Sequence, residues 1–211
     1  MYRRSLLFCF AIVVLIGCKK EEKHYSQTYS IRYYPYSDSF VAYANLAIGY
    51  KTLPLPSKES ITFDGQPAHS INNGVYVWSG TGRGKFDASF ILKKEQRTLV
   101  NSIALSKVPD FQLVCPDTVY KSKNLIVRVK NYVPDPTHVN LHFGNDRRDA
   151  GSIVKGDSVV FGASFLKEFE NGPARVRFNE WFKEPLQNSD NNLGEHIRYD
   201  IVLEKAVWLT D

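Results

Sequence analysis

Apolar and polar residues alternate with a period of two along most of the chain from Tyr29 onward. The alternation is clear in residues 86–92 of the first half and in residues 197–204 of the second. Successive side chains of a strand point to opposite faces, so this period predicts strands with one buried face and one solvent face. The sequence therefore predicts an all-β fold, in which only residues 165–170 and 180–186 have the composition of a short helical turn.

Turn-forming residues divide the alternating segments into short strands. Pro, Gly, Asn and Asp recur at intervals of roughly ten residues, which is typical of an all-β sandwich. The Asn-Asn-Gly sequence of residues 72–74 predicts one such turn, leading into a strand. Pro109 lies between two strand-rich halves of similar length, and a proline favours a linker because it cannot donate a ladder hydrogen bond. We therefore expect one β-sandwich in residues 28–108 and a second in residues 109–211.

Each half resembles an immunoglobulin-like sandwich, which has about 100 residues and strands of this density. The Cys and Trp spacing of antibody domains is absent from both halves, so the resemblance extends to the broad architecture. It implies two tandem immunoglobulin-like β-sandwich domains and no specific activity.

The N-terminus has the organisation of an export signal. Two arginines precede an apolar run, residues 6–16, that is too short to span a bilayer. The run ends in Leu15-Ile16-Gly17-Cys18, which resembles the lipobox of bacterial lipoproteins. The resemblance implies that residues 1–17 are a cleaved signal peptide and that Cys18 becomes the lipidated N-terminus of the mature protein.

A charged segment follows this cysteine. Lys20, Glu21 and Glu22 resemble the export pattern of surface lipoproteins in Bacteroidota. The same charges also suit a solvated tether, residues 18–27, between the lipid and the first domain. Lys19 differs from the Asp that commonly marks inner-membrane retention in lipoproteins. The resemblance therefore implies a protein that is lipid-anchored in the outer membrane, exposed on the cell surface, and attached to the membrane through its N-terminal lipid.

Charge and cysteine content narrow the partners further. The formal net charge is +5, but the basic residues form no cluster with interleaved aromatics, so we expect no nucleic-acid partner. Once Cys18 is lipidated and the signal is removed, Cys115 has no cysteine with which to form an intramolecular disulfide. At strand period Cys115 shares a face with Phe111 and Leu113, which predicts a buried thiol.

The sequence contains no group of residues that specifies a catalytic or metal site. His138 and His142 fall on the same face of a predicted strand, but a metal needs a third and usually a fourth ligand. The Asn- and Asp-rich residues 188–194 offer oxygen ligands without the spacing of a known calcium loop. We expect no catalytic residue, no metal and no cofactor.

Aromatic residues beside predicted loops are the remaining candidates for ligand contacts. They are Tyr34, Tyr36, Trp181 and Phe182. Exposed rings at these positions could stack on sugar faces or fill the pocket of a protein partner, and the same rings could instead cap a sandwich core. The sequence leaves both arrangements open.

The preferred hypothesis is a lipid-anchored surface protein with a non-catalytic role in binding or assembly, whose partner is a protein or a glycan. An alternative is a carbohydrate-binding accessory lipoprotein of a polysaccharide uptake system. A third is a hydrolase on a β scaffold, which for glycoside hydrolysis needs two carboxylates at a defined separation in a cleft.

Overall fold

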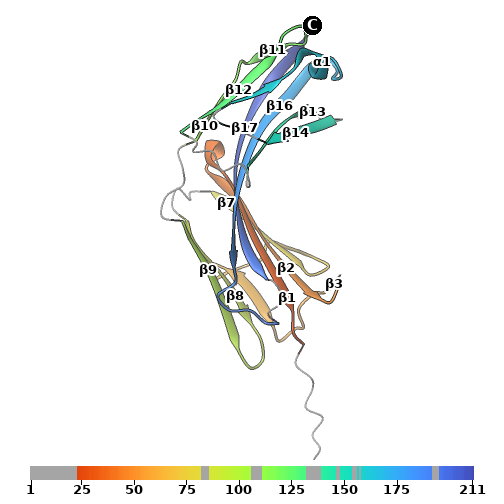
Figure 1. Ribbon diagram of the computed structural model, residues 1–211. Coiled ribbons are helices and arrows are strands. Elements are labelled where there is room, and N and C mark those ends of the chain that lie inside the picture. The colour runs from red at the N-terminus through yellow and green to blue at the C-terminus, as the bar shows by residue number, and fades with distance from the viewer. Residues whose placement is uncertain are drawn as a thin grey trace, which may run out of the picture.

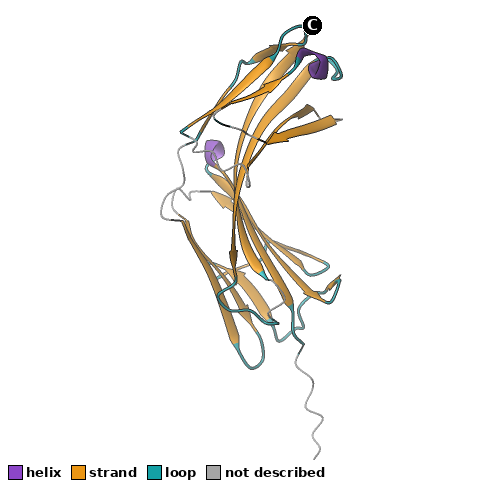
Figure 2. Cartoon of the chain, viewed as in Figure 1, coloured by secondary structure: helices purple, strands orange, loops and turns teal. Residues whose placement is uncertain are grey.

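The computed structural model describes residues 23–81, 86–105, 111–131, 139–145, 148–153, 156, 158–191 and 195–211. The signal peptide, Cys18 and the export residues Lys20, Glu21 and Glu22 lie outside this part of the chain. The described part is almost entirely strand (Figure 2), and the predicted all-β, sandwich-like fold is confirmed. Its elements are β1 (Ser26–Tyr34), η1 (Pro35–Ser37), β2 (Ser39–Ile48), β3 (Lys51–Thr52), β4 (Ser60–Phe63), β5 (Gln66–Pro67), β6 (Ser70–Asn72), β7 (Val75–Thr81), β8 (Phe86–Lys93), β9 (Thr98–Leu105), β10 (Gln112–Val114), β11 (Thr118–Tyr120), β12 (Leu125–Lys130), β13 (Val139–Asn145), β14 (Arg148–Ile153), β15 (Ser158–Phe161), α1 (Ala163–Leu166), β16 (Gly172–Pro185) and β17 (His196–Thr210).

One large sheet of ten strands extends through the molecule. Its main path has the order β14-β13-β16-β17-β1-β2-β7-β6, with β11 paired to β17 and β3 paired to β2. The hairpin of β16 and β17 contributes 14 and 15 residues. It stays in register from Gly172 opposite Leu209 to Pro185 opposite His196. Figure 1 shows this hairpin, in blue, running from the upper part of the molecule through its narrow middle into the lower part.

Two smaller sheets cover the inward face of the large sheet. The four-stranded sheet β5-β4-β8-β9 packs on the lower part, where the ring centroids of Tyr29 and Phe90 stack 4.4 Å apart. The three-stranded sheet β10-β12-β15 packs on the upper part, where the rings of Phe143 and Phe161 are 5.8 Å apart. Each part is therefore a sandwich of two sheets, and the large sheet is common to both.

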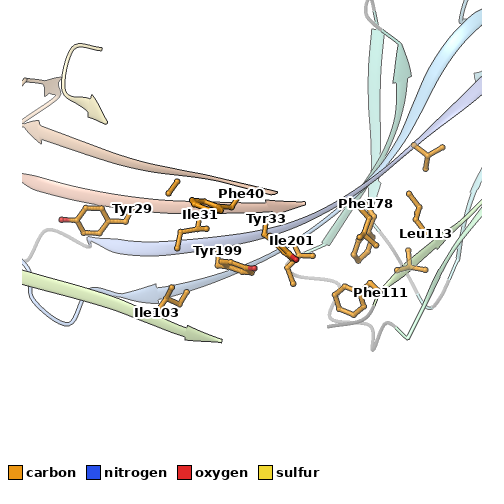
Figure 3. Packing of buried hydrophobic residues seen from close by; sticks show 14 of the residues in the cluster. Tyr29, Ile31, Tyr33, Phe40, Ile103, Phe111, Leu113, Phe178, Tyr199 and Ile201 are labelled. Atoms are coloured by element: carbon orange, nitrogen blue, oxygen red, sulfur yellow. The ribbon is translucent and has the colours of Figure 1, made fainter. Parts of the chain in front are cut away.

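The buried side chains form one continuous cluster along the inward face of the large sheet. Ile31 and Tyr33 alternate inward on β1, and Ile201 of β17 lies beside Tyr33 at the narrow middle (Figure 3). Phe178 of β16 continues the cluster into the upper part, where Phe111 packs edge-on against it with centroids 5.7 Å apart. Because burial of apolar surface is the dominant stabilising term in folding, this shared cluster joins the two parts energetically.

The sheets do not divide at the boundary that the sequence suggests. Separate sandwiches in residues 28–108 and 109–211 would place β1 and β17 in different units, but residues 196–201 of β17 pair in parallel with Thr28 through Tyr33 of β1. Pro109 itself lies outside the described residues. The difference has a simple physical reason, because alternation identifies the two faces of a strand and not its neighbours.

Two shorter segments also differ from expectation. The helix α1 overlaps the first predicted helical turn, residues 165–170, but residues 180–185 extend β16 because β17 supplies a hydrogen-bonding partner along this whole segment. The predicted tether, residues 18–27, overlaps the folded region, since Tyr25 and Gln27 are buried and β1 begins before Gln27.

The turn between β6 and β7 is the predicted Asn-Asn-Gly turn. Asn73 and Gly74 have φ angles of 46° and 83°, which is the left-handed conformation that the two central residues of a type I′ hairpin turn adopt. A Cβ atom on Gly74 would lie 2.5 Å from the backbone of Leu53. Glycine is therefore required here for its conformation and for the close approach of a second chain segment.

The loop after β16 is fastened to the start of the fold by a buried carboxylate. Asp190 Oδ2 accepts hydrogen bonds from the backbone nitrogen of Tyr25 at 2.6 Å and from Lys94 Nζ at 2.9 Å. Arg97 also pairs with this carboxylate, and Lys94 Nζ donates to the carbonyl of Lys23 at 2.5 Å. Asp190 is one of the oxygen ligands that the sequence offers for calcium, and the fold uses it in this ion cluster.

Candidate functional site

The outward face of the large sheet carries a group of polar residues on four neighbouring strands, β13, β16, β17 and β1. The strand register places His142 beside Arg177 and Asn179 beside Val202. Paired residues of neighbouring strands point to the same face of a sheet. Side chains from opposite ends of the chain therefore converge on this face.

These side chains surround a hollow of about 160 Å³, which we call the outer hollow. Its lining residues are Arg32 and Tyr34 of β1, His142 of β13, Arg177 and Asn179 of β16, and Val202 of β17. Sites that enclose a whole drug-sized ligand measure about 300 Å³ or more. The outer hollow therefore has room for one compact group of a larger ligand.

Two carboxylates lie on the same face, and arginines hold both of them. Glu204 Oε2 accepts a hydrogen bond from Arg177 Nε at 2.9 Å, and Glu204 Oε1 accepts one from Arg175 Nη1 at 3.4 Å. Asp200 Oδ1 accepts two hydrogen bonds from the guanidinium of Arg198, at 2.8 and 2.6 Å. These arginines compensate the negative charges of Glu204 and Asp200. The electrostatic potential near the hollow therefore depends on the cationic side chains that have no carboxylate partner.

Most polar atoms of the outer hollow are hydrogen-bond donors without a partner. Within the described part of the chain, the guanidinium of Arg32, the hydroxyl of Tyr34 and the amide nitrogen of Asn179 make no hydrogen bond. Arg177 uses Nε for its bond to Glu204, and its terminal nitrogens contact no acceptor among these residues. The amide oxygen of Asn179 is shielded from solvent and is likewise unpaired there. The hollow thus presents donors and positive charge, which suit an acceptor-rich anionic group.

Two of the four predicted ligand contacts lie on this outward face. Tyr34 lines the outer hollow, and Trp181 lies opposite Asp200 in the register of β16 and β17. The guanidinium of Arg198 lies 4.8 Å from the centroid of the Trp181 ring, within the range of a cation–π interaction. The structure therefore brings Tyr34 and Trp181 to one face, with Arg198 covering one side of the indole.

The other two predicted contacts have structural roles. Tyr36 lies in η1 and is exposed, but its hydroxyl accepts a hydrogen bond from the backbone nitrogen of Leu113 at 2.8 Å and so connects η1 to β10. Phe182 is partly buried and packs against the hydrophobic core. Neither residue belongs to the outer hollow.

Sequence reasoning does not identify Arg32, Arg177 or Asn179 as site residues. Each occupies an outward position of an alternating strand, which is the only local signal that the sequence offers. The hollow exists because β1 lies beside β17, and that pairing cannot be inferred from alternation. His142 lines the outer hollow, and His138, which the sequence places on the same strand face, lies outside the described residues. Residues 23–211, in their described parts, contain no group of three His, Cys, Asp or Glu side chains able to hold a metal.

Cys115 is buried on the same face as Phe111 and Leu113, which confirms the prediction. Burial raises the pKa of its thiol, and this effect exceeds the opposing influence of the Lys205 ammonium. A protonated thiol is a poor nucleophile. The residue therefore has the properties of a core side chain.

A second hollow, of about 260 Å³, lies on the hairpin of β8 and β9. Its lining residues are Asp87, Ala88, Ser89, Ser102, Ile103 and Ala104. All six belong to two adjacent strands, and Asp87 is the one charged side chain among them. This arrangement concentrates less binding chemistry than the outer hollow does.

No protein-family model and no curated protein matches this chain. Among solved structures, the chain is similar to one described as three N-terminal domains of the bacteriophage RB49 Highly Immunogenic Outer Capsid protein (Hoc), with 12% sequence identity and a TM-score of 0.28. The similarity covers 89% of this chain and 58% of that chain. A similarity at this level supports no inference about function.

Proposed function

We propose that this protein is anchored by lipid in the outer membrane, displayed at the cell surface, and serves a non-catalytic binding role with its ligand at the outer hollow. The unpaired donors of Arg32, Tyr34, Arg177 and Asn179 are the observation that supports the binding role. These donors come from β1 and β16 and converge on one hollow, so a single acceptor-rich group could bond to several of them together.

The membrane anchor is supported by the N-terminal sequence. Leu15-Ile16-Gly17-Cys18 ends an apolar run, and Lys20, Glu21 and Glu22 follow it. A single acyl chain gives only marginal attachment, whereas the several chains of a bacterial lipoprotein give a stable anchor. Among the described residues, no helix has the length and apolar character needed to cross a membrane.

A carbohydrate-binding accessory role in a polysaccharide uptake system is the second candidate. Tyr34 and Trp181 favour it, because both rings lie on the outward face and aromatic rings provide apolar surface for a sugar ring. A hydrolase has less support. Glycoside hydrolysis uses a pair of carboxylates in defined roles, and on this face Asp200 and Glu204 are both bonded to arginines.

The anchor is tested by replacing the cysteine that would carry the lipid. Cells expressing Cys18→Ala should incorporate no radiolabelled palmitate into the protein, and the variant should disappear from the outer-membrane fraction. Cys115→Ala is the matched control, because it removes the other mature thiol and should leave labelling unchanged. Outer-membrane recovery of Cys18→Ala equal to that of the parent would refute the lipoprotein assignment.

Surface display is tested by replacing Lys20, Glu21 and Glu22 together with Ala. The variant should remain membrane-bound but become protected from protease added to intact cells. Replacement of Lys58 and Glu95 by Ala is the control, because these residues form an exposed ion pair at 3.4 Å outside the tether. Equal digestion of the tether variant and the parent would show that the charges only solvate the tether.

The binding role is tested with the full chain purified in detergent and applied to immobilised oligosaccharides from bacterial and plant polysaccharides. We expect saturable binding to at least one of them, and its loss in Tyr34→Ala. Tyr120→Ala is the matched control, because Tyr120 is an exposed tyrosine on β11, outside the outer hollow. If the parent binds none of these saccharides, the glycan form of the proposed function is wrong.

A further inference from the structure

We propose that the outer hollow binds the acid group of an anionic saccharide, either the carboxylate of a uronic acid or the sulfate of a sulfated sugar. This inference rests on the proposed binding function and names the ligand class of the same site. Three properties of the hollow support it: the kind of hydrogen-bonding atoms that it presents, its uncompensated charge, and the uncharged surface beside it.

The hydrogen-bonding atoms favour a group that only accepts. Arg32, the terminal nitrogens of Arg177 and the amide nitrogen of Asn179 are all donors, and none has a partner among the described residues. The one amide oxygen in the lining, on Asn179, is shielded from solvent. A sugar hydroxyl needs both a donor and an acceptor to be fully satisfied, whereas a carboxylate or sulfate accepts at every oxygen. Hydrogen bonds from guanidinium to an oxyanion are also about twice as strong as neutral ones.

The charge favours an anion as well. Four arginines surround two carboxylates on this part of the face, and the carboxylates are bonded to Arg175, Arg177 and Arg198. Arg32 is exposed and forms no ion pair with any described residue. Its positive charge is therefore available to a ligand. Since Arg32 is in contact with solvent, its attraction for an anion falls as salt screens the interaction.

The surface on the β2 side of the hollow favours a saccharide over a membrane or a nucleic acid. In the strand register, Ser39, Val41 and Tyr43 of β2 lie beside Tyr34, Arg32 and Ser30 of β1. These outward positions of β2 carry no charge. An anionic membrane surface or a nucleic-acid backbone needs basic residues spread over a broad area. A saccharide instead needs one site for its acid group and a neutral, hydroxyl-bearing and aromatic surface for the sugars that follow.

The size of the hollow agrees with this arrangement. About 160 Å³ accommodates a single acid-bearing group, not a whole oligosaccharide. The phenol of Tyr34 lies at the boundary between the hollow and β2, where its hydroxyl can donate to the acid group and its ring can pack against a sugar. The remaining sugar units of the saccharide would then extend over the outward face of β1 and β2.

The test uses saccharides that differ only in charge. The full chain in detergent is titrated by calorimetry with oligogalacturonate and with its methyl ester, and separately with oligosaccharides of dextran sulfate and with those of dextran. We expect one acidic saccharide to bind at least about tenfold more tightly than its neutral counterpart. The carboxylate and sulfate pairs identify which acid the site prefers. Raising the salt concentration should lower the affinity for the acidic saccharide and leave the affinity for the neutral one unchanged.

Three variants locate the binding at the outer hollow. Arg32→Met removes the free charge and keeps most of the aliphatic stem, and it should reduce the affinity for the acidic saccharide at least about tenfold. Tyr34→Phe removes one donor, retains the ring and should weaken binding severalfold. Lys183→Met is the control, because Lys183 is exposed on β16, outside the lining of the hollow, and its loss removes the same charge. Circular dichroism should be the same for all three.

The outcomes separate this inference from the proposed function. Equal binding of neutral and acidic saccharides, lost in Tyr34→Ala but retained in Arg32→Met, would leave the binding role intact and overturn the oxyanion assignment. Binding of no saccharide would overturn this inference and the glycan form of the proposed function, and would leave a protein ligand as the form that stands. Displacement of the acidic saccharide by phosphatidylglycerol vesicles but not by phosphatidylcholine vesicles would assign the hollow to a membrane surface. This result would also overturn the assignment of a saccharide as the ligand.

Discussion

Asp190 and Lys94 form a buried ion pair, since neither side chain has exposed surface. Asp190→Asn removes the negative charge and leaves the Lys94 ammonium buried without its counterion. Breaking a buried pair by removing one partner costs about 3 kcal/mol or more. We expect a loss of this size in the free energy of unfolding at pH 7, measured by urea denaturation. Asp87→Asn, at an exposed position of β8, should change this free energy by less than about 0.5 kcal/mol.

The lowered pKa of Asp190 predicts how the free energy of unfolding depends on pH. Burial raises the pKa of Asp190. The hydrogen bond from the Tyr25 N–H and the charges of Lys94 and Arg97 lower this pKa by more than burial raises it, so the net pKa lies below its usual value. A depressed pKa in the folded state contributes stability that is present above the unfolded value, about 3.9, and is lost as pH falls through the folded value. The parent should therefore lose stability below about pH 4, with a smaller loss in Asp190→Asn. Parallel pH profiles for the two proteins would contradict this explanation.

Cys115 provides a second prediction at the residue scale. Its thiol is buried and its pKa is raised, so reaction with a thiol reagent should be slow in the native protein and complete in denaturant. Cys115→Ser places a hydroxyl among apolar neighbours and should cost about 1 to 3 kcal/mol of unfolding free energy. Cys115→Ala is the control that removes the thiol without adding a polar group. Native labelling as fast as that of a free thiol would show that the segment after β10, which contains Cys115, opens readily.

At the scale of single elements, the β6–β7 hairpin depends on Gly74. Gly74→Ala requires a side chain at a φ of 83°, and its Cβ would meet the backbone of Leu53 at 2.5 Å. We expect a loss of about 2 kcal/mol or more in unfolding free energy, because strain and steric overlap add. Gly49→Ala is a matched control, since Gly49 also has a positive φ, of 62°, but no atom lies within 4 Å of its Cβ position. The control should lose about 1 kcal/mol. Equal losses would mean that the contact with Leu53 relaxes freely.

The elements also show what sequence alone can predict. The Asn-Asn-Gly turn and the burial of Cys115 follow from local chemistry, because turn conformation and strand period are properties of a few consecutive residues. The extent of β16 does not, since residues 180–185 belong to a strand through their pairing with β17, which the local sequence does not reveal. The outer hollow is harder still, because Arg32 and Arg177 meet only through the order of strands in the sheet. The extent of β16 and the outer hollow both depend on pairing between strands that are far apart in the sequence, and a local sequence pattern does not reveal such pairing.

At the scale of the whole molecule, the β16–β17 hairpin serves the core and the candidate site together. Phe178 points inward to the shared hydrophobic cluster, and the next residue, Asn179, points outward to the outer hollow. The same strands pair with β13 in the upper part and, through β17, with β1 in the lower part. A site on paired strands is held more rigidly than a site on loops. The position of the outer hollow is therefore fixed by the elements that join the two parts.

This continuity predicts that neither half folds when the chain is cut near residue 109. A fragment of residues 23–108 lacks β17, so one edge of β1 loses its hydrogen bonds, and Ile31 and Tyr33 lose their buried neighbours Tyr199 and Ile201. A fragment of residues 109–211 retains β17 but leaves its residues 196–201 without β1. Each fragment alone should show no cooperative unfolding transition in urea, monitored by circular dichroism. An equimolar mixture of the two fragments should show one, and so should the uncut chain of residues 23–211, which is the control. A cooperative transition in isolated residues 23–108 with the midpoint of the uncut chain would show that β17 contributes nothing to the stability of the lower sandwich.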